Sequence, residues 1–156
     1  LVWVSTLLTP DATIIDVDEM TMPDNEERMM STIGGAQKLI RIEPPGSVLA
    51  ASKLIAAEVA SNSVDVVFSN HAQYYDDALI EFDQFFKFVK PGGFFVVNDA
   101  YWEGDGQRKG KCQALAQIDR YFPVYCVHME DPVHRFLPLE DVGGKWGTLA
   151  VIQKPL

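Results

Sequence analysis

The stretch VDVVFSNHAQYYDDALIEFDQFFKFVKPGGFFVVND, residues 64–99, decides the fold. It begins with an apolar, β-branched run at 64–69 that is typical of a buried strand. Apolar residues then recur at helical spacing over 75–89, and a Pro-Gly-Gly turn leads into a second strand pattern at 91–99. Alternation of continuously apolar strands with a helix predicts a parallel sheet covered by helices on both faces.

The same alternation continues on both sides of this stretch. Upstream, the pattern predicts strands at 12–20 and 38–42 and helices at 23–37 and 47–61. Downstream, it predicts a helix at 110–122, a strand at 123–130 and a final strand at 145–155. Since no helix separates the last two strands, we expect them to form an antiparallel pair. The predicted fold class is α/β, mostly parallel, with an antiparallel pair of strands at the C-terminal end.

Composition limits the partners. A chain of 156 residues with 47% hydrophobic and 22% charged residues is typical of one soluble globular domain. A net charge of -9 argues against nucleic acid, and the one basic cluster, Arg108-Lys109-Lys111, is interpreted as a solvated loop. No apolar run approaches the roughly 20 residues of a membrane helix. The two cysteines, Cys112 and Cys126, are expected to be reduced, so we expect a cytoplasmic protein.

Polar side chains follow each predicted strand. In open α/β sheets, ligands bind outside the carboxyl ends of the strands. The acids at the end of the 12–20 strand have the chemistry to accept hydrogen bonds from ribose hydroxyls. The ends of the predicted strands at 64–69 and 91–99 are expected to face each other across one crevice. The side chains at these strand ends are Asp16, Asp18, Asn70, His71, Gln73, Asn98, Asp99, Tyr101 and Trp102.

These residues resemble a known family. Residues 64–104 resemble the fourth and fifth strands of class I S-adenosylmethionine-dependent methyltransferases, most closely the small-molecule O-methyltransferases of the catechol and caffeoyl-CoA type. The family's D-[IVL]-[IV]-F-x-D strand corresponds to Asp65–Asn70, its [KR]-x-G-G turn to Lys90–Gly93, and its Asp-Asn strand end to Asn98-Asp99 with Trp102. The resemblance covers residues 10–155. It implies a Rossmann-like methyltransferase sheet, S-adenosylmethionine as cofactor, and methyl transfer to a small-molecule hydroxyl.

The chain departs from the family at its start. It has no counterpart of the family's first strand or Gly-rich loop, and neither E-x-G-x-x-x-G nor G-x-G-x-G occurs. Only nine residues precede Pro10, too few for a strand and a crossover helix. We therefore expect residues 1–156 to be a single methyltransferase-like domain that is incomplete at its N-terminus, with a gap in its sheet. A degenerate first strand at LVWV, or loss of the cofactor half, are the alternatives.

The metal-dependent members of the family keep carboxylates at the ends of the fourth and fifth strands. Here Asn70 takes the first position, and Asn98-Asp99 reverses the order of the second pair. One carboxylate and two amides are poor ligands for a hard cation. We therefore expect no metal. His71 is then the candidate base, because its unperturbed pKa lies near neutrality; the alternative is a histidine that caps the strand end.

The remaining roles follow from position. We assign cofactor binding to Asp16, with Asp18 as fallback, together with Ser47 and Asn70, and a catalytic role to Asp99 beside His71. The aromatic residues Tyr74, Tyr75 and Trp102 are candidates for contact with a planar acceptor; helix initiation or loop packing is the alternative for each. His128, within a predicted strand, is interpreted as structural.

Three functions stay open at the level of sequence. The first is O-methyl transfer to a small molecule. The second is a catalytically inactive methyltransferase-like domain with an assembly role, suggested by the absent Gly-rich loop and by Asn70. The third is another small-molecule enzyme, such as a hydroxylase-like relative, on the same scaffold. The expected partner is a small-molecule substrate, with a homo-oligomer as an open option and neither nucleic acid nor membrane as a partner.

Overall fold

In the computed structural model, the chain forms two compact units, residues 1–55 and 56–156. The structure describes residues 13–17, 38–42, 48–70, 72–101, 103, 105, 107, 109–128, 136–138 and 148–156. For residues 13–17, 38–42, 128 and 136–138 only the backbone is described.

The first unit contains a parallel strand pair. Strands β1 (Thr13–Val17) and β2 (Lys38–Ile42) pair in parallel, with Ile15 opposite Ile40. Both lie where the sequence predicts strands. Helix α3 (Val48–Glu58) follows β2 and begins in this unit. It buries Ala51, Ser52 and Ile55. Their spacing is that of one helical face, as the Ala-rich pattern predicts.

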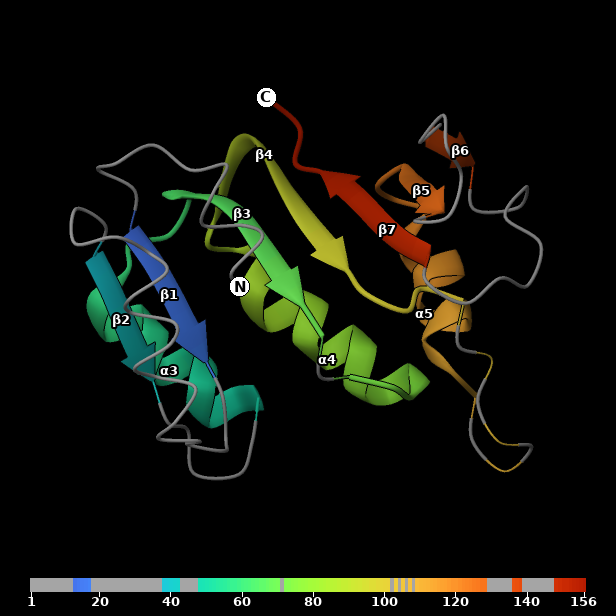
Figure 1. The fold of residues 1–156 in the computed structure, drawn as a ribbon, viewed down its shortest axis with the longest axis horizontal. Coiled ribbons are helices and arrows are strands. Elements are labelled where there is room, and N and C mark those ends of the chain that lie inside the picture. The colour runs from blue at the N-terminus through green and yellow to red at the C-terminus, as the bar shows by residue number, and fades with distance from the viewer. Residues whose placement is uncertain are drawn as a thin grey trace. The chain divides into compact units, whose positions relative to one another are not determined.

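The second unit is built on a five-stranded sheet with the order β3-β4-β7-β5-β6 (Figure 1). Strand β3 (Val64–Ser69) is parallel to β4 (Val89–Val97), and these two are joined by helix α4 (Tyr75–Phe86). Strand β7 (Thr148–Gln153) is antiparallel to both β4 and β5 (Val124–His128). The predicted antiparallel pair at the C-terminal end is therefore confirmed. The sequence did not predict β6 (Phe136–Pro138), which adds an antiparallel edge to β5.

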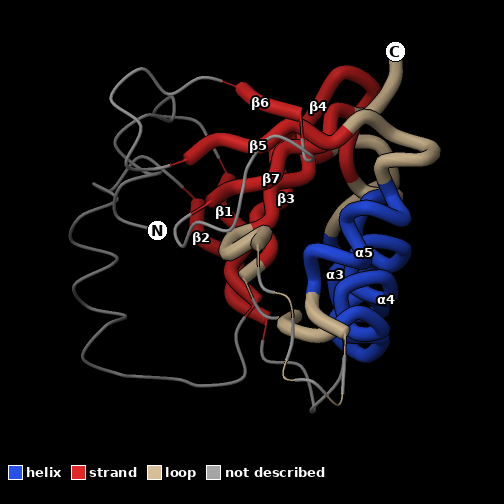
Figure 2. Tube along the Cα trace, turned by 90° about the vertical axis from the view of Figure 1, so that its right-hand side faces the viewer, coloured by secondary structure: helices blue, strands red, loops and turns tan. Residues whose placement is uncertain are grey.

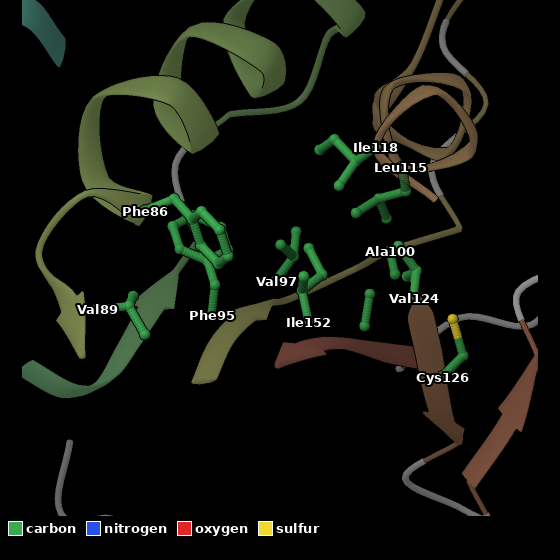
Figure 3. Packing of buried hydrophobic residues seen from close by; sticks show 11 residues of the cluster. Phe86, Val89, Phe95, Val97, Ala100, Leu115, Ile118, Val124, Cys126 and Ile152 are labelled. Atoms are coloured by element: carbon green, nitrogen blue, oxygen red, sulfur yellow. The ribbon is translucent and has the colours of Figure 1, made fainter. Parts of the chain in front are cut away.

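The core of this unit lies between the sheet and its helices. Along β4, Phe95 and Val97 are buried, whereas Phe94 between Gly93 and Phe95 is 38% exposed. The buried strand residues pack against α4 and α5 (Lys111–Ile118), and both helices lie on one side of the strands (Figure 2). Figure 3 shows this cluster, which includes Phe86, Phe95, Val97, Leu115, Ile118, Val124, Cys126 and Ile152.

The other face of this sheet carries exposed apolar side chains. Val66 and Phe68 on β3 are 52% and 53% exposed, and Tyr125 on β5 is 46% exposed. The sequence predicts helices on both faces, and within this unit the described helices α4 and α5 cover the face that holds the core. Among the described residues, no helix has the length and apolar character needed to cross a bilayer.

The Lys-Pro-Gly-Gly motif is an insertion within β4. Val64 lies opposite Val89, but Val66 lies opposite Phe94, so the pairing is irregular where residues 90–93 intervene. Gly92 has a positive φ of 78°, which glycine adopts most readily. At Gly93, a Cβ atom would lie 2.8 Å from the Asp65 carbonyl oxygen, so the two backbones approach too closely for a side chain. The positive φ at Gly92 and the close backbone approach at Gly93 therefore explain the two glycines of the motif.

Lys154 connects three parts of the second unit. Its Nζ donates hydrogen bonds to Asn62 Oδ1 at 2.7 Å and to the Phe86 carbonyl oxygen at 3.0 Å. It also lies over the Phe86 ring, 5.2 Å from the centroid. The positive charge thus sits at the C-terminus of α4, where the helix dipole favours a cation.

We expect Lys154→Met to lower the free energy of unfolding by about 1–3 kcal/mol, since hydrogen bonds from a charged donor contribute on this scale. Urea denaturation measures the loss. Lys90→Met is the control: Lys90 pairs with Asp65, but the two side chains are 46% and 75% exposed. Such surface pairs contribute at most about 1 kcal/mol. Equal losses in the two variants would contradict the role assigned to Lys154.

Candidate active site

The carboxyl ends of β3 and β4 meet through their polar residues. The Asn98 backbone N–H donates to the Ser69 carbonyl oxygen at 2.9 Å, which extends the parallel pairing to the last strand residues. Beyond it, Asn98 Nδ2 donates to Asn70 Oδ1 at 2.7 Å. Asn70 is exposed, and Asn98 is half-buried. The structure thus joins two strand ends that the sequence expects to share one site.

Asp99 adds a carboxylate at this point. Its φ of 49° is in the left-handed region, where aspartate is among the few tolerated non-glycine residues. The turn is fixed on its far side because the Ala100 N–H donates to the Thr148 carbonyl oxygen at 2.9 Å. Asp99 itself is exposed, with Oδ2 at 3.4 Å from Asn98 Nδ2. Unfavourable backbone conformations of this kind concentrate at functional sites.

Tyr74 and Tyr75 are held by the segment that follows β4. Tyr74 forms an isolated antiparallel bridge with Gly110, and its hydroxyl donates to Asp105 Oδ2 at 3.1 Å. The Tyr75 N–H donates to the Lys109 carbonyl oxygen at 2.8 Å, and Lys109 Nζ lies 5.7 Å from the Tyr75 ring centroid. Both tyrosines are half-buried. The chain after β3 and the chain after β4 are therefore bound to each other at two places.

Lys111 corrects one interpretation of the sequence. The basic cluster Arg108-Lys109-Lys111 is interpreted above as a solvated loop, but Lys111 is only 3% exposed and is the first residue of α5. Its Nζ donates to the Asn98 carbonyl oxygen at 2.8 Å. A signal was present: Lys111 shares the buried stripe of α5 with Ala114, Leu115 and Ile118, at helical spacing. A lysine on an apolar stripe is a candidate for burial beside a site.

Glu81 is a second polar residue that sequence reasoning missed. It lies on α4, is 5% exposed, and its Oε2 accepts a hydrogen bond from the Ala72 N–H at 3.1 Å. Ala72 belongs to the loop between β3 and α4, two residues after Asn70. The apolar stripe predicted for this helix includes Ala78 and Phe82, and Glu81 is one turn from Ala78. Because residues near Glu81 in this helix are hydrophobic, the pattern predicts an apolar helix face and does not indicate that Glu81 itself is buried.

Other predicted site residues are only partly described. Asp16 lies on β1 opposite Arg41, but its side chain is not among the described ones. His71, Asp18, Ser47 and Trp102 lie outside the described residues, so their assigned roles stay predictions.

Both cysteines are free. Burial raises the pKa of Cys126 to about 12, and it raises the pKa of Cys112 as well. Cys126 is completely buried on β5, within the core of the second unit. A raised pKa disfavours the reactive thiolate. Cys126 is therefore unsuited to act as a catalytic nucleophile.

Comparison with solved structures shows the fold. The chain resembles a methyltransferase from Burkholderia thailandensis, the 1,6-didemethyltoxoflavin-N1-methyltransferase solved with 1,6-didemethyltoxoflavin and S-adenosylhomocysteine, with a TM-score of 0.54 at 19% identity. The match covers 91% of this chain and 61% of that protein. The chain has a Rossmann-like methyltransferase fold. A protein from Corynebacterium glutamicum matches with a TM-score of 0.53 at 17% identity, over 92% of this chain and 61% of that one.

This chain thus spans about three fifths of the length of each of these two proteins. No protein-family model matches the sequence, and a search of curated proteins finds no match. At such low identity, the likeness concerns the fold alone. The order β3-β4-β7-β5, with its antiparallel end, places Asn70, Asn98 and Asp99 at the strand ends of a methyltransferase-like sheet.

Proposed function

We propose that this protein transfers a methyl group from S-adenosylmethionine to a hydroxyl of a small molecule. The observation that carries the proposal is the joined strand end in which Asn98 binds Asn70 beside the exposed carboxylate of Asp99. This group lies at the carboxyl end of adjacent parallel strands, where open α/β sheets bind ligands. The fold supports the proposal because one similar structure is a methyltransferase with S-adenosylhomocysteine bound.

The residues present suit the cofactor in their chemistry. S-adenosylmethionine, when bound, supplies a methyl group on a good leaving group. Asn70 is exposed, and its side-chain amide can donate and accept hydrogen bonds. Asp16, or Asp18 in its place, is proposed to accept hydrogen bonds from the ribose, and Ser47 is proposed to assist. These polar side chains at the strand ends are proposed to carry most of the binding that residues 1–156 contribute.

Methyl transfer is mostly a problem of alignment, with a base where the acceptor is a hydroxyl. We propose His71 as this base and Asp99 as its catalytic partner. Tyr74 and Tyr75, fixed by the segment that follows β4, are proposed to hold a planar acceptor together with Trp102. The site is proposed to work without a metal, since Asn70, Asn98 and Asp99 supply one carboxylate and two amides.

The base assignment is tested by His71→Ala. We expect kcat with a hydroxyl acceptor to fall by about 10²–10⁴-fold, and the pH dependence near the usual histidine pKa to disappear. Transfer of labelled methyl from S-adenosylmethionine to a panel of phenols and sugars measures both. The control is His128→Ala, a substitution at the histidine of β5, which should leave the pH profile unchanged. Unchanged turnover of His71→Ala at every pH would remove the assignment.

A second function is a non-catalytic domain with an assembly role. The exposed apolar side chains on one face of the five-stranded sheet favour it, since patches of this kind often mark contacts between proteins. In that case the protein would bind no S-adenosylmethionine and would associate with itself or another protein. For either function we propose a cytoplasmic protein, because it carries only two cysteines, both free.

A further inference from the structure

Two buried charges lie behind the strand-end site. Lys111 and Glu81 are 3% and 5% exposed, and they belong to α5 and α4, which contact each other. Lys111 Nζ donates to the Asn98 carbonyl oxygen at 2.8 Å, and Glu81 Oε2 accepts from the Ala72 N–H at 3.1 Å. Each charge therefore holds the backbone of one of the two segments that meet at the site.

The placement of Lys111 is unfavourable for folding. A buried ammonium loses its hydration, and this desolvation lowers the pKa of Lys111. The residue also begins α5, where the helix dipole disfavours a cation. The negative charges of Asp99 and Glu81 act in the opposite direction and favour the charged form. An apolar residue of similar volume would avoid these costs, so core packing alone does not explain a lysine here.

The two charges depend on each other. Glu81 is buried too, and a carboxylate removed from water needs a compensating positive charge or hydrogen bonds. Among the described residues, Glu81 attracts Lys111 electrostatically and accepts the Ala72 N–H. If either charge is removed alone, the other remains buried with less compensation, which is more destabilising than removing both. The backbone segments that the two charges hold are thereby coupled.

We propose that Glu81 and Lys111 act as a pair of positioning residues that fix the backbone at Ala72 and the strand end 98–100 relative to each other. Lys111 sets the position of Asn98, whose side chain binds Asn70, and Glu81 sets the loop backbone two residues after Asn70. Glu81 and Lys111 belong to α4 and α5, and both contact the backbone near the strand ends. Asn70 and Asp99 remain exposed. That this support serves methyl transfer rests on the proposed function; the coupling itself does not.

Amide hydrogen exchange measured by NMR on the full chain tests the coupling. The variants are Glu81→Gln, Lys111→Met and the double variant, and the reporter is the Ala72 amide. The Ile152 amide, in the centre of the sheet, reports global stability. Leu115→Ala is the control, because it leaves a cavity beside α5, the helix that carries Lys111, without removing a charge. Exchange protection at Ala72 is compared with protection at Ile152 in each protein.

We expect Lys111→Met to lower the protection of Ala72 at least about tenfold more than that of Ile152, although Lys111 does not bond to Ala72. The double variant should recover part of this loss, because the uncharged side chain that Glu81→Gln introduces keeps an amide oxygen to accept the Ala72 N–H. Leu115→Ala should lower the exchange protection of the Ala72 and Ile152 amides by a similar factor. Glu81→Gln conserves the shape of the side chain, so it gives a readable result even where Lys111→Met folds poorly. It should lower the ratio of Ala72 to Ile152 protection by several-fold.

Equal loss at Ala72 and Ile152 in the charge variants would overturn the proposal, since that is the result of a merely structural role. A double variant as damaged at Ala72 as Lys111→Met would overturn the coupling. These outcomes do not depend on cofactor or substrate. If exchange shows the coupling and the protein binds no S-adenosylhomocysteine, the proposed function fails while the support of the strand ends stands.

Discussion

Phe95→Ala is expected to lower the free energy of unfolding by about 3–5 kcal/mol, the usual effect of truncating a buried phenylalanine. Phe95 is 1% exposed, and its side chain lies beside that of Phe86 in the buried core (Figure 3). Its ring lies 5.3 Å from that of Phe82 in an edge-on arrangement and 6.3 Å from that of Phe86. Truncation removes these contacts and leaves a cavity that the β4 backbone cannot fill.

Phe94→Ala is the matched control, since it makes the same chemical change one residue earlier. Phe94 points to the opposite face of the sheet and is 38% exposed. We expect it to lose less than half as much stability as Phe95→Ala, because exposed side chains leave no cavity behind. Urea denaturation of both variants gives the comparison. Similar losses would mean that the side chains of β4 do not alternate between a core face and an open face as described.

Gly93→Ala is expected to lower the free energy of unfolding by about 1–3 kcal/mol, as for other overpacked sites. The new Cβ atom would lie 2.8 Å from the Asp65 carbonyl oxygen and 3.0 Å from that of Lys90. Both are backbone atoms, so relief requires the β3–β4 pairing to shift rather than a side chain to rotate. Because β3 and β4 carry Asn70 and Asn98 at their ends, the shift should also disturb the strand-end site.

The loss in Gly93→Ala is best measured beside Lys90→Met, which alters the same turn at the surface and is expected to change stability by no more than about 1 kcal/mol. A Gly93→Ala protein as stable as Lys90→Met would show that β3 and β4 do not approach as closely as the structure has them. The chemical shifts of the Ser69 and Asn98 amides would report whether the strand ends move.

Most of the second unit follows from sequence periodicity. The apolar run at 64–69 is β3 at full length, and the helical stripe that begins at Tyr75 is α4. The stripe is predicted to reach Val89, but α4 ends at Phe86 and Val89 begins β4. The error has a physical origin, because a buried apolar residue fits a helix end as well as a strand start. Strand β6, three residues long, is too short to give any periodic signal.

The candidate site was predictable only in part. The position of residues directly after parallel strands is enough to predict that they contribute to a site. The structure agrees for Asn70 and Asn98, whose side chains are joined by a hydrogen bond. The sequence does not indicate that Lys111 and Glu81 are buried, because charged residues usually lie on the solvated surface. Their burial depends on which face α4 and α5 turn to the sheet, a tertiary contact that local sequence does not specify.

The most direct test of the account is calorimetric titration of the full-length protein with S-adenosylhomocysteine. We predict saturable heat with one site per chain, weakened when Asn70 is replaced by alanine and when Asp16 is replaced by asparagine. The fold of each variant is checked first by urea denaturation. Absence of heat with both S-adenosylhomocysteine and S-adenosylmethionine, from protein that unfolds cooperatively, would contradict the assignment of this site to methyl transfer.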